Sequence, residues 1–352
     1  MTMIKNEPMT IQKALDVISR FGHLQAEDAE SVMEEIMKGD ATEAQIGAYL
    51  MALRMKGETS EEITGSARAM RNNSHKVPIS IEGDILDTCG TGGDSSGTFN
   101  ISTVTAFVCA GAGMPVAKHG NRAATSKSGS ADVLSALGVN LELTPEQVGQ
   151  CVDEIGIGFL FAVKLHPAMK YAIGPRRQMK LRTIFNILGP LTNPANANRQ
   201  LMGVFAADLT DLLAHVLKSL GSKSAMVVNG YGGMDELTVT GPNRISHLQE
   251  NGRIDTYELD PMKLGFEPAS IGQLMGGTPE DNAKILRGIL SGKLRGAKRD
   301  IVILNAGAAL WVAGKADNIE QGIKLAEESI DSGNAEQKLD ALIEMTQSFS
   351  NE

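Results

Sequence analysis

The chain has 352 residues, more than the roughly 250–300 at which a single hydrophobic core stops growing, so we expect one large and one small domain. Hydrophobic residues make up 42% of the chain and charged residues 21%, a mixture typical of globular proteins and unlike that of disordered or fibrous ones. The formal net charge of −9 argues against a general nucleic-acid or membrane-surface binder, which needs a basic face, but allows a phosphate ligand in a locally basic pocket.

Residues 1–75 carry the patterns of helices and none of strands. Two segments have the capping-box spacing, in which a hydroxyl and a side chain three residues later satisfy free N–H groups: Thr42 with Gln45, and Thr59 with Glu62. Between them, apolar residues recur at helical spacing and form one face: Ile46, Tyr49, Leu50 and Leu53. We therefore predict a small four-helix domain over residues 1–75.

From about residue 77 the pattern changes to alternating strands and helices. Buried strands are predicted at Ile85–Leu86, Val116–Ala117, Ile157–Phe161, Leu201–Phe205, Ala225–Val228 and Ile301–Leu304. Helices are predicted at Val104–Ala112, Ser130–Leu137, from Thr144, and at Thr210–Leu220, Thr278–Leu290 and Ala308–Val312. This alternation predicts an α/β domain over 76–352, with a mainly parallel central sheet flanked by helices and an antiparallel insertion within 235–260.

One run does not fit the alternation. Thr183–Pro194 (TIFNILGPLTNP) is apolar and helix-like and then punctuated by proline. We expect it to return to the helical domain, so that about 183–200 joins residues 1–75.

Cysteine usage and the N-terminus indicate the compartment. The three cysteines, Cys89, Cys109 and Cys151, are few and odd in number, and no CxxC pair is present. The N-terminal sequence lacks the apolar core of a signal peptide, and Ser102–Ala117 is too short and too polar for a membrane span. We predict a reduced, cytoplasmic protein with no membrane contact.

A glycine-rich loop follows the first predicted strand. In Asp87–Asp94 (DTCGTGGD), glycines allow backbone N–H groups to approach a phosphate closely, although an ordinary tight turn is the alternative. The loop is neither a Walker A motif nor a GxGxxG motif. The next segment, Ser95–Thr103, carries five hydroxyls and an amide, which can bind phosphate oxygens or Mg²⁺; helix capping accounts for only one or two of them.

Two further segments carry charge suited to a phosphate ligand. Lys118–Ser130 combines three cations, His119 and four hydroxyls around glycines, which suits a multiply charged anion better than a core; a solvated loop is the alternative. In Gly232–Thr238, the adjacent Asp235 and Glu236 could bind Mg²⁺, although adjacent acids are also common on surfaces. No Asp or Glu occurs within Ser95–Ala131 or within Ile155–Ala207, so two basic windows interrupt an acidic chain.

Together these segments resemble the anthranilate phosphoribosyltransferases, a family with the nucleoside phosphorylase type of phosphoribosyltransferase fold. The resemblance covers nearly the whole chain and rests on five motifs in family order: GTGGD (Gly90–Asp94), NIST (Asn100–Thr103), KHGNR (Lys118–Arg122), HPAMK (His166–Lys170) and TIFNILGPLTNP (Thr183–Pro194). Ala123–Ser126 reads AATS where the family has AVSS, a mild change that keeps a hydroxyl at Thr125.

The resemblance implies transfer of the 5-phosphoribosyl group from phosphoribosyl pyrophosphate to the amine of anthranilate, a step of tryptophan biosynthesis. It implies a helical domain followed by a phosphoribosyl pyrophosphate-binding α/β domain, a homodimer, and two Mg²⁺ ions per subunit. It leaves association with anthranilate synthase components open. We expect no obligate covalent intermediate and no essential cysteine.

The resemblance also implies site residues. The predicted catalytic residues are Lys118, His119 and Arg176. Phosphoribosyl pyrophosphate is predicted to contact Gly90, Gly93, Asp94, Thr98, Asn100, Ile101, Ser102, Thr103, Lys118, His119, Gly120, Asn121, Arg122, Ala123, Ala124, Thr125, Ser126 and Ser130. Anthranilate is predicted to contact Gly90, Asn121 and Arg176. The metal is predicted to bind Ser102, Asp235 and Glu236.

Two alternatives stay open. One is a pyrimidine nucleoside phosphorylase of the same fold, which KHGNR and the Asp235–Glu236 pair disfavour. The other is a non-catalytic nucleic-acid-binding relative, which the net charge and the confinement of basic residues to the motif windows disfavour.

Overall fold

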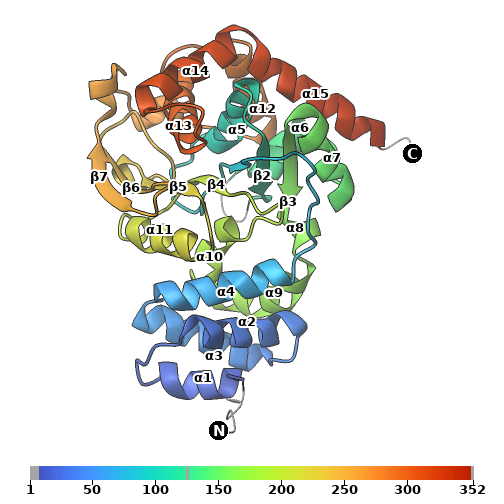
Figure 1. Ribbon diagram of the computed structural model, residues 1–352, viewed down its shortest axis with the longest axis vertical. Coiled ribbons are helices and arrows are strands. Elements are labelled where there is room, and N and C mark those ends of the chain that lie inside the picture. Colours follow the sequence, from blue (N-terminus) through green and yellow to red (C-terminus); the bar gives the residue numbers. More distant parts are fainter. Residues whose placement is uncertain (1–7, 124–126, 350–352) are drawn as a thin grey trace. The chain divides into compact units, whose positions relative to one another are not determined.

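The computed structural model describes residues 8–123 and 127–349, and these form two compact units (Figure 1). The helical unit contains the described residues up to His75 together with His166–Thr192. The α/β unit contains Lys76–Leu165 and the chain from Asn193 onward. The helical unit is thus discontinuous, and its second segment begins earlier and ends earlier than the return predicted over about 183–200.

The first part of the helical unit has the predicted four helices within its described residues: α1 (Ile11–Ile18), α2 (Ala26–Lys38), α3 (Glu43–Lys56) and α4 (Ser60–Asn72). The second part adds α9 (Lys170–Met179) and α10 (Phe185–Leu188), with short 3-10 turns at Pro167–Met169 and Gly189–Leu191. Both predicted capping boxes are present, at the N-termini of α3 and α4. The predicted apolar face of α3 is fully buried, as expected for the core side of an amphipathic helix.

A buried ion pair joins α3 to α4. The Lys56 Nζ lies 2.6 Å from the Glu62 Oε2, and 1% and 0% of the two side chains are exposed. Glu62 also accepts hydrogen bonds from the backbone N–H groups of Leu24 (3.0 Å) and Thr59 (2.9 Å). Glu62 therefore fixes the chain before α2 and the start of α4 as well as the end of α3.

The α/β unit is built on a sheet of seven strands within the described residues, in the order β3-β2-β1-β4-β5-β6-β7. The strands are β1 (Leu86–Asp87), β2 (Val116–Gly120), β3 (Ile157–Phe161), β4 (Arg199–Gly203), β5 (Ser224–Asn229), β6 (Asn243–Leu248) and β7 (Ile254–Leu259). Pairing is parallel from β3 to β5, and β6 and β7 are antiparallel, which confirms the predicted insertion within 235–260.

The helices of the α/β unit pack on the sheet and on one another: α5 (Ile101–Gly111), α6 (Ser130–Ala136), α7 (Pro145–Ile155), α8 (Ala162–Leu165), α11 (Leu209–Ser219), α12 (Pro279–Leu290), α13 (Ala297–Val312), α14 (Ile319–Asp331) and α15 (Asn334–Ser348). In Figure 1, α5 and α13 lie on one side of the sheet and α11 on the other. Within residues 8–123 and 127–349, none of the helices combines the length and the apolar character that a membrane crossing requires.

One predicted strand is wrong. Ile301–Leu304 lies inside α13, in the same helix as Ala308–Val312. Every residue from Ile301 to Leu310 is buried, so this part of the helix is enclosed on all sides, and Asn305 is its one polar side chain. A short, continuous apolar run does not distinguish a buried strand from a buried helix, and here the helix is formed.

The topology brings several loops to one edge of the sheet. Because β1, β2, β4 and β5 are parallel, the segments that follow them all start at the same edge. β1 has β2 and β3 on one side and β4 and β5 on the other. The strand order therefore reverses at β1, because the later strands β4 and β5 are added on the side opposite to β2 and β3. Open parallel sheets place their ligands at such switch points.

The Lys56–Glu62 pair gives a test of the helical unit. Glu62→Ala leaves a buried lysine unpaired and two backbone N–H groups without their acceptor, so we expect a loss of about 3–5 kcal/mol in the free energy of unfolding. The exposed neighbour Glu61→Ala should change it by less than about 1 kcal/mol. Urea denaturation followed by circular dichroism measures both, and equal small effects would contradict this role of Glu62.

Candidate active site

The segments after β1, β4 and β5 approach one another very closely. A Cβ on Gly203, at the end of β4, would lie 1.4 Å from the Asp235 carbonyl oxygen, and one on Gly90 would lie 3.0 Å from the Gly203 carbonyl oxygen. The Thr91 N–H donates to the same Gly203 oxygen at 2.8 Å. Glycine is required at position 203 for this approach, and the approach places Asp235 beside the glycine loop.

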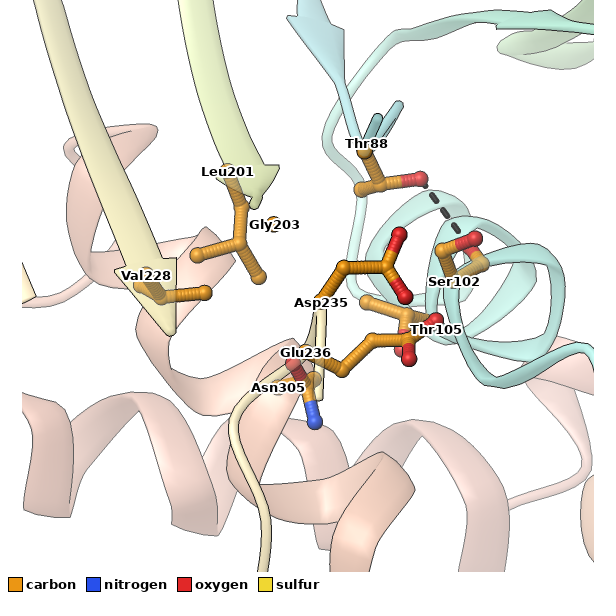
Figure 2. A pocket seen from close by; sticks show the side chains of 10 residues that line it. Thr88, Ser102, Thr105, Leu201, Gly203, Val228, Asp235, Glu236 and Asn305 are labelled. Atoms are coloured by element: carbon orange, nitrogen blue, oxygen red, sulfur yellow. Dashed lines mark hydrogen bonds between the residues drawn. The ribbon is translucent and has the colours of Figure 1, made fainter. Parts of the chain in front are cut away.

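Three carboxylates come together here. Asp94, Asp235 and Glu236 each offer an oxygen, and these oxygens lie within 4.8 Å of one another. The Asp235 Oδ2 accepts from the Gly92 N–H at 2.6 Å, and the Asp235 N–H donates to the Asp94 Oδ2 at 3.3 Å. Figure 2 shows the Asp235 and Glu236 side chains pointing toward Ser102 and Thr105 of α5.

The protein holds these carboxylates at an electrostatic cost. Burial, and then the charge of Asp94, raise the pKa of Asp235 to about 7. Burial, and then the charges of Asp235 and Asp94, raise the pKa of Glu236 well above its usual value, while Lys118 acts in the opposite direction. Such a group of hard oxygen donors fits Mg²⁺, which is usually held by one or two carboxylates together with substrate phosphates and water.

Two of these carboxylates, Asp235 and Glu236, line a pocket with an empty volume of about 250 Å³, part of it open to solvent. Other lining residues include Thr88, Gly90, Ser102, Thr105, Gly203 and Asn305. All three predicted metal residues, Ser102, Asp235 and Glu236, therefore line one pocket. Asp94, predicted only as a substrate contact, belongs to the acidic cluster as well; its place after the paired glycines gave no sign of this.

Lys118 lies within β2, whereas the sequence predicted a loop from this residue onward. The residue is 3% exposed, and its Nζ donates to the Thr88 carbonyl oxygen (3.3 Å), the Thr88 Oγ1 (3.4 Å) and the Ser102 Oγ (3.3 Å). These contacts are to neutral oxygens. A buried cation held in this way can oppose negative charge on a ligand at the sheet edge.

Asp87 fixes β2 against β1 behind the site. It is fully buried, and its carboxylate accepts from the His119 N–H at 3.2 Å and from the Asn193 Nδ2 at 2.8 Å. Asn193 also donates to the Ala117 carbonyl oxygen at 2.8 Å. Burial raises the pKa of Asp87 to about 6, although Lys118 and the hydrogen bonds oppose the shift. Sequence reasoning assigned no role to either side chain, because 106 residues separate them.

Asp132 joins the two ends of the loop after β2 through hydrogen bonds. The Ala123 and Gly129 N–H groups both donate to its Oδ2 at 2.9 Å, and the Arg122 guanidinium donates to its Oδ1 at 3.0 Å. The same guanidinium lies 5.6 Å from the centre of the Phe161 ring. Ala124, Thr125 and Ser126, all predicted substrate contacts, lie outside the described residues.

The structure places the other predicted residues as follows. The loop after β1 and the start of α5 carry Gly90, Gly93, Asp94, Thr98, Asn100, Ile101, Ser102 and Thr103. β2 and its loop carry Lys118, His119, Gly120, Asn121, Arg122 and Ala123, and α6 begins at Ser130. The side chains of Ile101 and Thr103 are fully buried, so only their backbone groups can meet a ligand.

Arg176 belongs to the helical unit. It lies on α9, where its guanidinium is 5.1 Å from the centre of the Phe185 ring. His166, the first residue of the HPAMK motif, also belongs to this unit and is buried. The α/β unit therefore contains every described site residue predicted above except Arg176.

The three cysteines are free, and Cys109 and Cys151 are buried. Burial raises the pKa of the Cys89 thiol, with Asp87 adding to the shift, so this group beside Gly90 is not activated as a nucleophile.

Comparisons with known proteins agree with this geometry. Residues 11–74 match a family described as "Glycosyl transferase family, helical bundle domain", and residues 82–336 match "Glycosyl transferase family, a/b domain". The chain is 52% identical over 339 residues to the anthranilate phosphoribosyltransferase of Acetivibrio thermocellus, which covers 96% of this chain and 97% of that protein. The corresponding protein of Moorella thermoacetica is 52% identical over 328 residues, with coverage of 93% and 96%.

Solved structures are similar as well. The crystal structure of anthranilate phosphoribosyltransferase from Thermus thermophilus superposes with a TM-score of 0.90 at 40% identity, covering 95% of this chain and 99% of that one. The Saccharomyces cerevisiae protein in complex with PRPP and Mg superposes with a TM-score of 0.87 at 28% identity, with coverage of 96% and 98%.

The acidic cluster predicts a metal response. Mg²⁺ should raise the melting temperature of the wild-type protein, because a ligand at about a hundredfold excess over its Kd stabilises the fold by about 2.7 kcal/mol. Asp235→Asn should remove most of this response and raise the stability of the metal-free protein, since it relieves like-charge repulsion. Glu328→Gln, in the exposed Glu327–Glu328 pair of α14, is the matched control and should keep the response. An undiminished response in D235N would contradict the assignment.

Asp87 predicts a pH dependence. Its pKa is raised from 3.8 to about 6, so the folded state binds more protons than the unfolded state between these values, and Asp87 makes stability fall as pH rises. In Asp87→Asn this contribution is absent. The free energy of unfolding of D87N relative to wild type should therefore increase by roughly 1–3 kcal/mol between about pH 4 and pH 7. Urea denaturation across this range measures the difference, and a constant difference would contradict the account.

Proposed function

The chain belongs to the anthranilate phosphoribosyltransferase family, and we propose that it transfers the 5-phosphoribosyl group of phosphoribosyl pyrophosphate to the amine of anthranilate. The products are N-(5′-phosphoribosyl)anthranilate and pyrophosphate, and the reaction uses Mg²⁺ and belongs to tryptophan biosynthesis. The observation that carries the proposal is the cluster of Asp94, Asp235 and Glu236, with Lys118 nearby, at the C-terminal ends of the parallel strands.

The reaction places charge where this site can oppose it. The bond from C1′ to the pyrophosphate oxygen breaks, C1′ passes through an oxocarbenium-like state, and the amine nitrogen forms the new bond and loses a proton. Negative charge then grows on the pyrophosphate. The buried Lys118 ammonium is held in place before the reaction, so it can stabilise this charge without reorganising. Asp94, Asp235 and Glu236 would hold Mg²⁺, which supplies further neutralisation of the leaving group.

The glycine loop and its neighbours would bind phosphoribosyl pyrophosphate. Its contacts would be the residues predicted above from Gly90 to Ser130, with Ile101 and Thr103 acting through their backbone. Asn121 and Gly90 would contact anthranilate, and His119 would line the same region as a polar group. The positions of the described members of this set in the α/β unit support a role in orienting the substrates, which alone can supply a large part of the rate.

Arg176 would bind the anthranilate carboxylate. Its planar guanidinium matches a carboxylate in two parallel hydrogen bonds. Burial lowers the pKa of this group, but an arginine remains charged in proteins. The Phe185 ring beneath it limits the directions in which the guanidinium can turn.

Three finer features rest on the family likeness and the sequence. We propose two Mg²⁺ ions per subunit, a homodimer, and a cytoplasmic location, the last supported by three free thiols without a pairing pattern.

An assay that follows pyrophosphate release together with anthranilate consumption tests the function. With phosphoribosyl pyrophosphate, anthranilate and Mg²⁺, the protein should release pyrophosphate and consume anthranilate in equal amounts. The fluorescence of anthranilate measures its consumption. Lys118→Met should lower kcat by about 100-fold, since a preorganised charge is lost. Arg176→Lys should raise the KM for anthranilate by about tenfold, because the two-point contact is lost.

Cys89→Ala is the control and should keep wild-type kinetics. Pyrophosphate release that does not depend on anthranilate would refute the proposal, and phosphorolysis of pyrimidine nucleosides would favour the phosphorylase alternative.

A further inference from the structure

Asn282 is a buried polar side chain on α12, 2% exposed, to which sequence reasoning gave no role. The start of α12 holds it rigidly. Thr278 and Asp281 form a capping box, and Pro279 occupies the first turn. The Asn282 Oδ1 accepts from the Gly277 N–H at 2.8 Å, which fixes the orientation of the carboxamide.

The other end of this carboxamide contacts the substrate-binding segment. The Asn282 Nδ2 donates to the Asn100 Oδ1 at 3.0 Å. Asn100 stands at the N-cap position of α5, yet its side chain makes no capping hydrogen bond. Instead, its Nδ2 donates to the Ser128 carbonyl oxygen at 3.1 Å, and the Ser128 Oγ donates to its Oδ1 at 3.3 Å.

The orientation of both carboxamides, and so the direction of the hydrogen bond between them, is determined by the Gly277 N–H. A backbone N–H can only donate, so Asn282 must turn its oxygen to Gly277 and its NH₂ group to Asn100. Asn100 must then turn its oxygen to Asn282 and its NH₂ group to Ser128. Reversal of either carboxamide would bring two donors or two acceptors together.

The backbone before α12 is also tied to the segment that precedes Asn100. The Gly276 N–H donates to the Gly97 carbonyl oxygen at 2.9 Å, and the Phe99 N–H donates to that of Leu274 at 3.3 Å. The Lys298 Nζ donates to the Gln273 and Met275 carbonyl oxygens, both at 2.7 Å. The segment before α12 and the start of α12 thus support the loop after β1, and Asn282 is the residue of this segment that contacts the Asn100 side chain.

We propose that Asn282 is a positioning residue for phosphoribosyl pyrophosphate. It orients the Asn100 carboxamide and, through it, fixes Ser128 in the loop that follows β2. Asn282 is 182 residues from Asn100 in sequence and acts without touching the substrate. This inference rests on the proposed function, in which Asn100 contacts phosphoribosyl pyrophosphate.

Asn282→Asp is the most informative variant. It keeps an acceptor for the Gly277 N–H but removes the donor to Asn100. Asn100 must then reverse to donate to the new carboxylate, which turns its oxygen toward the Ser128 carbonyl oxygen. We expect the KM for phosphoribosyl pyrophosphate to rise about 10- to 100-fold, as for other supporting hydrogen bonds behind a site, with the KM for anthranilate changed less than about threefold.

Asn140→Ala is the matched control. Asn140 also makes tertiary hydrogen bonds in the α/β unit: its Nδ2 donates to the Thr346 carbonyl oxygen at 3.3 Å, and its backbone N–H donates to the Thr346 Oγ1 at 3.1 Å. N140A should lower the melting temperature and leave both KM values unchanged. A wild-type KM in a folded N282D, or the same KM change in N140A, would overturn the proposal.

A double-mutant cycle gives a second test that does not require N282D to fold. If Asn282 acts through Asn100, Asn100→Ala and Asn282→Ala should each raise the KM for phosphoribosyl pyrophosphate, and the double variant should match N100A. Effects that multiply would overturn the proposal. Absence of anthranilate-dependent turnover in the wild type would instead refute the proposed function, and calorimetric binding of phosphoribosyl pyrophosphate would then still compare the variants.

Discussion

Three carboxylates and one lysine are held together near the C-terminal ends of the parallel strands, and the site described above depends on this arrangement. Asp94, Asp235 and Glu236 repel one another, which burial makes worse, as the raised pKa of Asp235 and Glu236 indicates. The close backbone approach at Gly203 and the hydrogen bond from the Gly92 N–H hold Asp235 in spite of this repulsion. A site that holds these carboxyl groups and a buried ammonium together before its ligand arrives is prepared for a cation and a polyanion together.

The supports of this site come from distant parts of the chain. Asp87 and Asn193 fix Lys118 and His119 by holding the backbone of β2, and their hydrogen bond spans 106 residues. From the other side, Asn282 on α12 fixes Asn100 across 182 residues. The proposed ligand-binding residues of the α/β unit therefore lie on loops and at the ends of the adjoining strands and helices, and these strands and helices determine where the loops begin and end.

Local patterns determined what could be predicted from the sequence. The capping boxes at Thr42 and Thr59 need only neighbours three residues away, and both are present. The glycine loop and the Asp235–Glu236 pair were found for the same reason. Ile301–Leu304 was predicted wrongly, because an apolar run fits a buried strand and a buried helix equally well. Asp87, Asn193 and Asn282 could not be found, since their roles depend on contacts far along the chain.

A crystal structure of the protein with phosphoribosyl pyrophosphate and Mn²⁺, with anomalous scattering to locate the metal, tests the central claim most directly. The account predicts a metal peak within coordination distance of carboxylate oxygens of the Asp94, Asp235 and Glu236 cluster, with the pyrophosphate between that metal and the glycine loop. A pyrophosphate bound away from this edge of the sheet, or a metal with no ligand from the cluster, would contradict it.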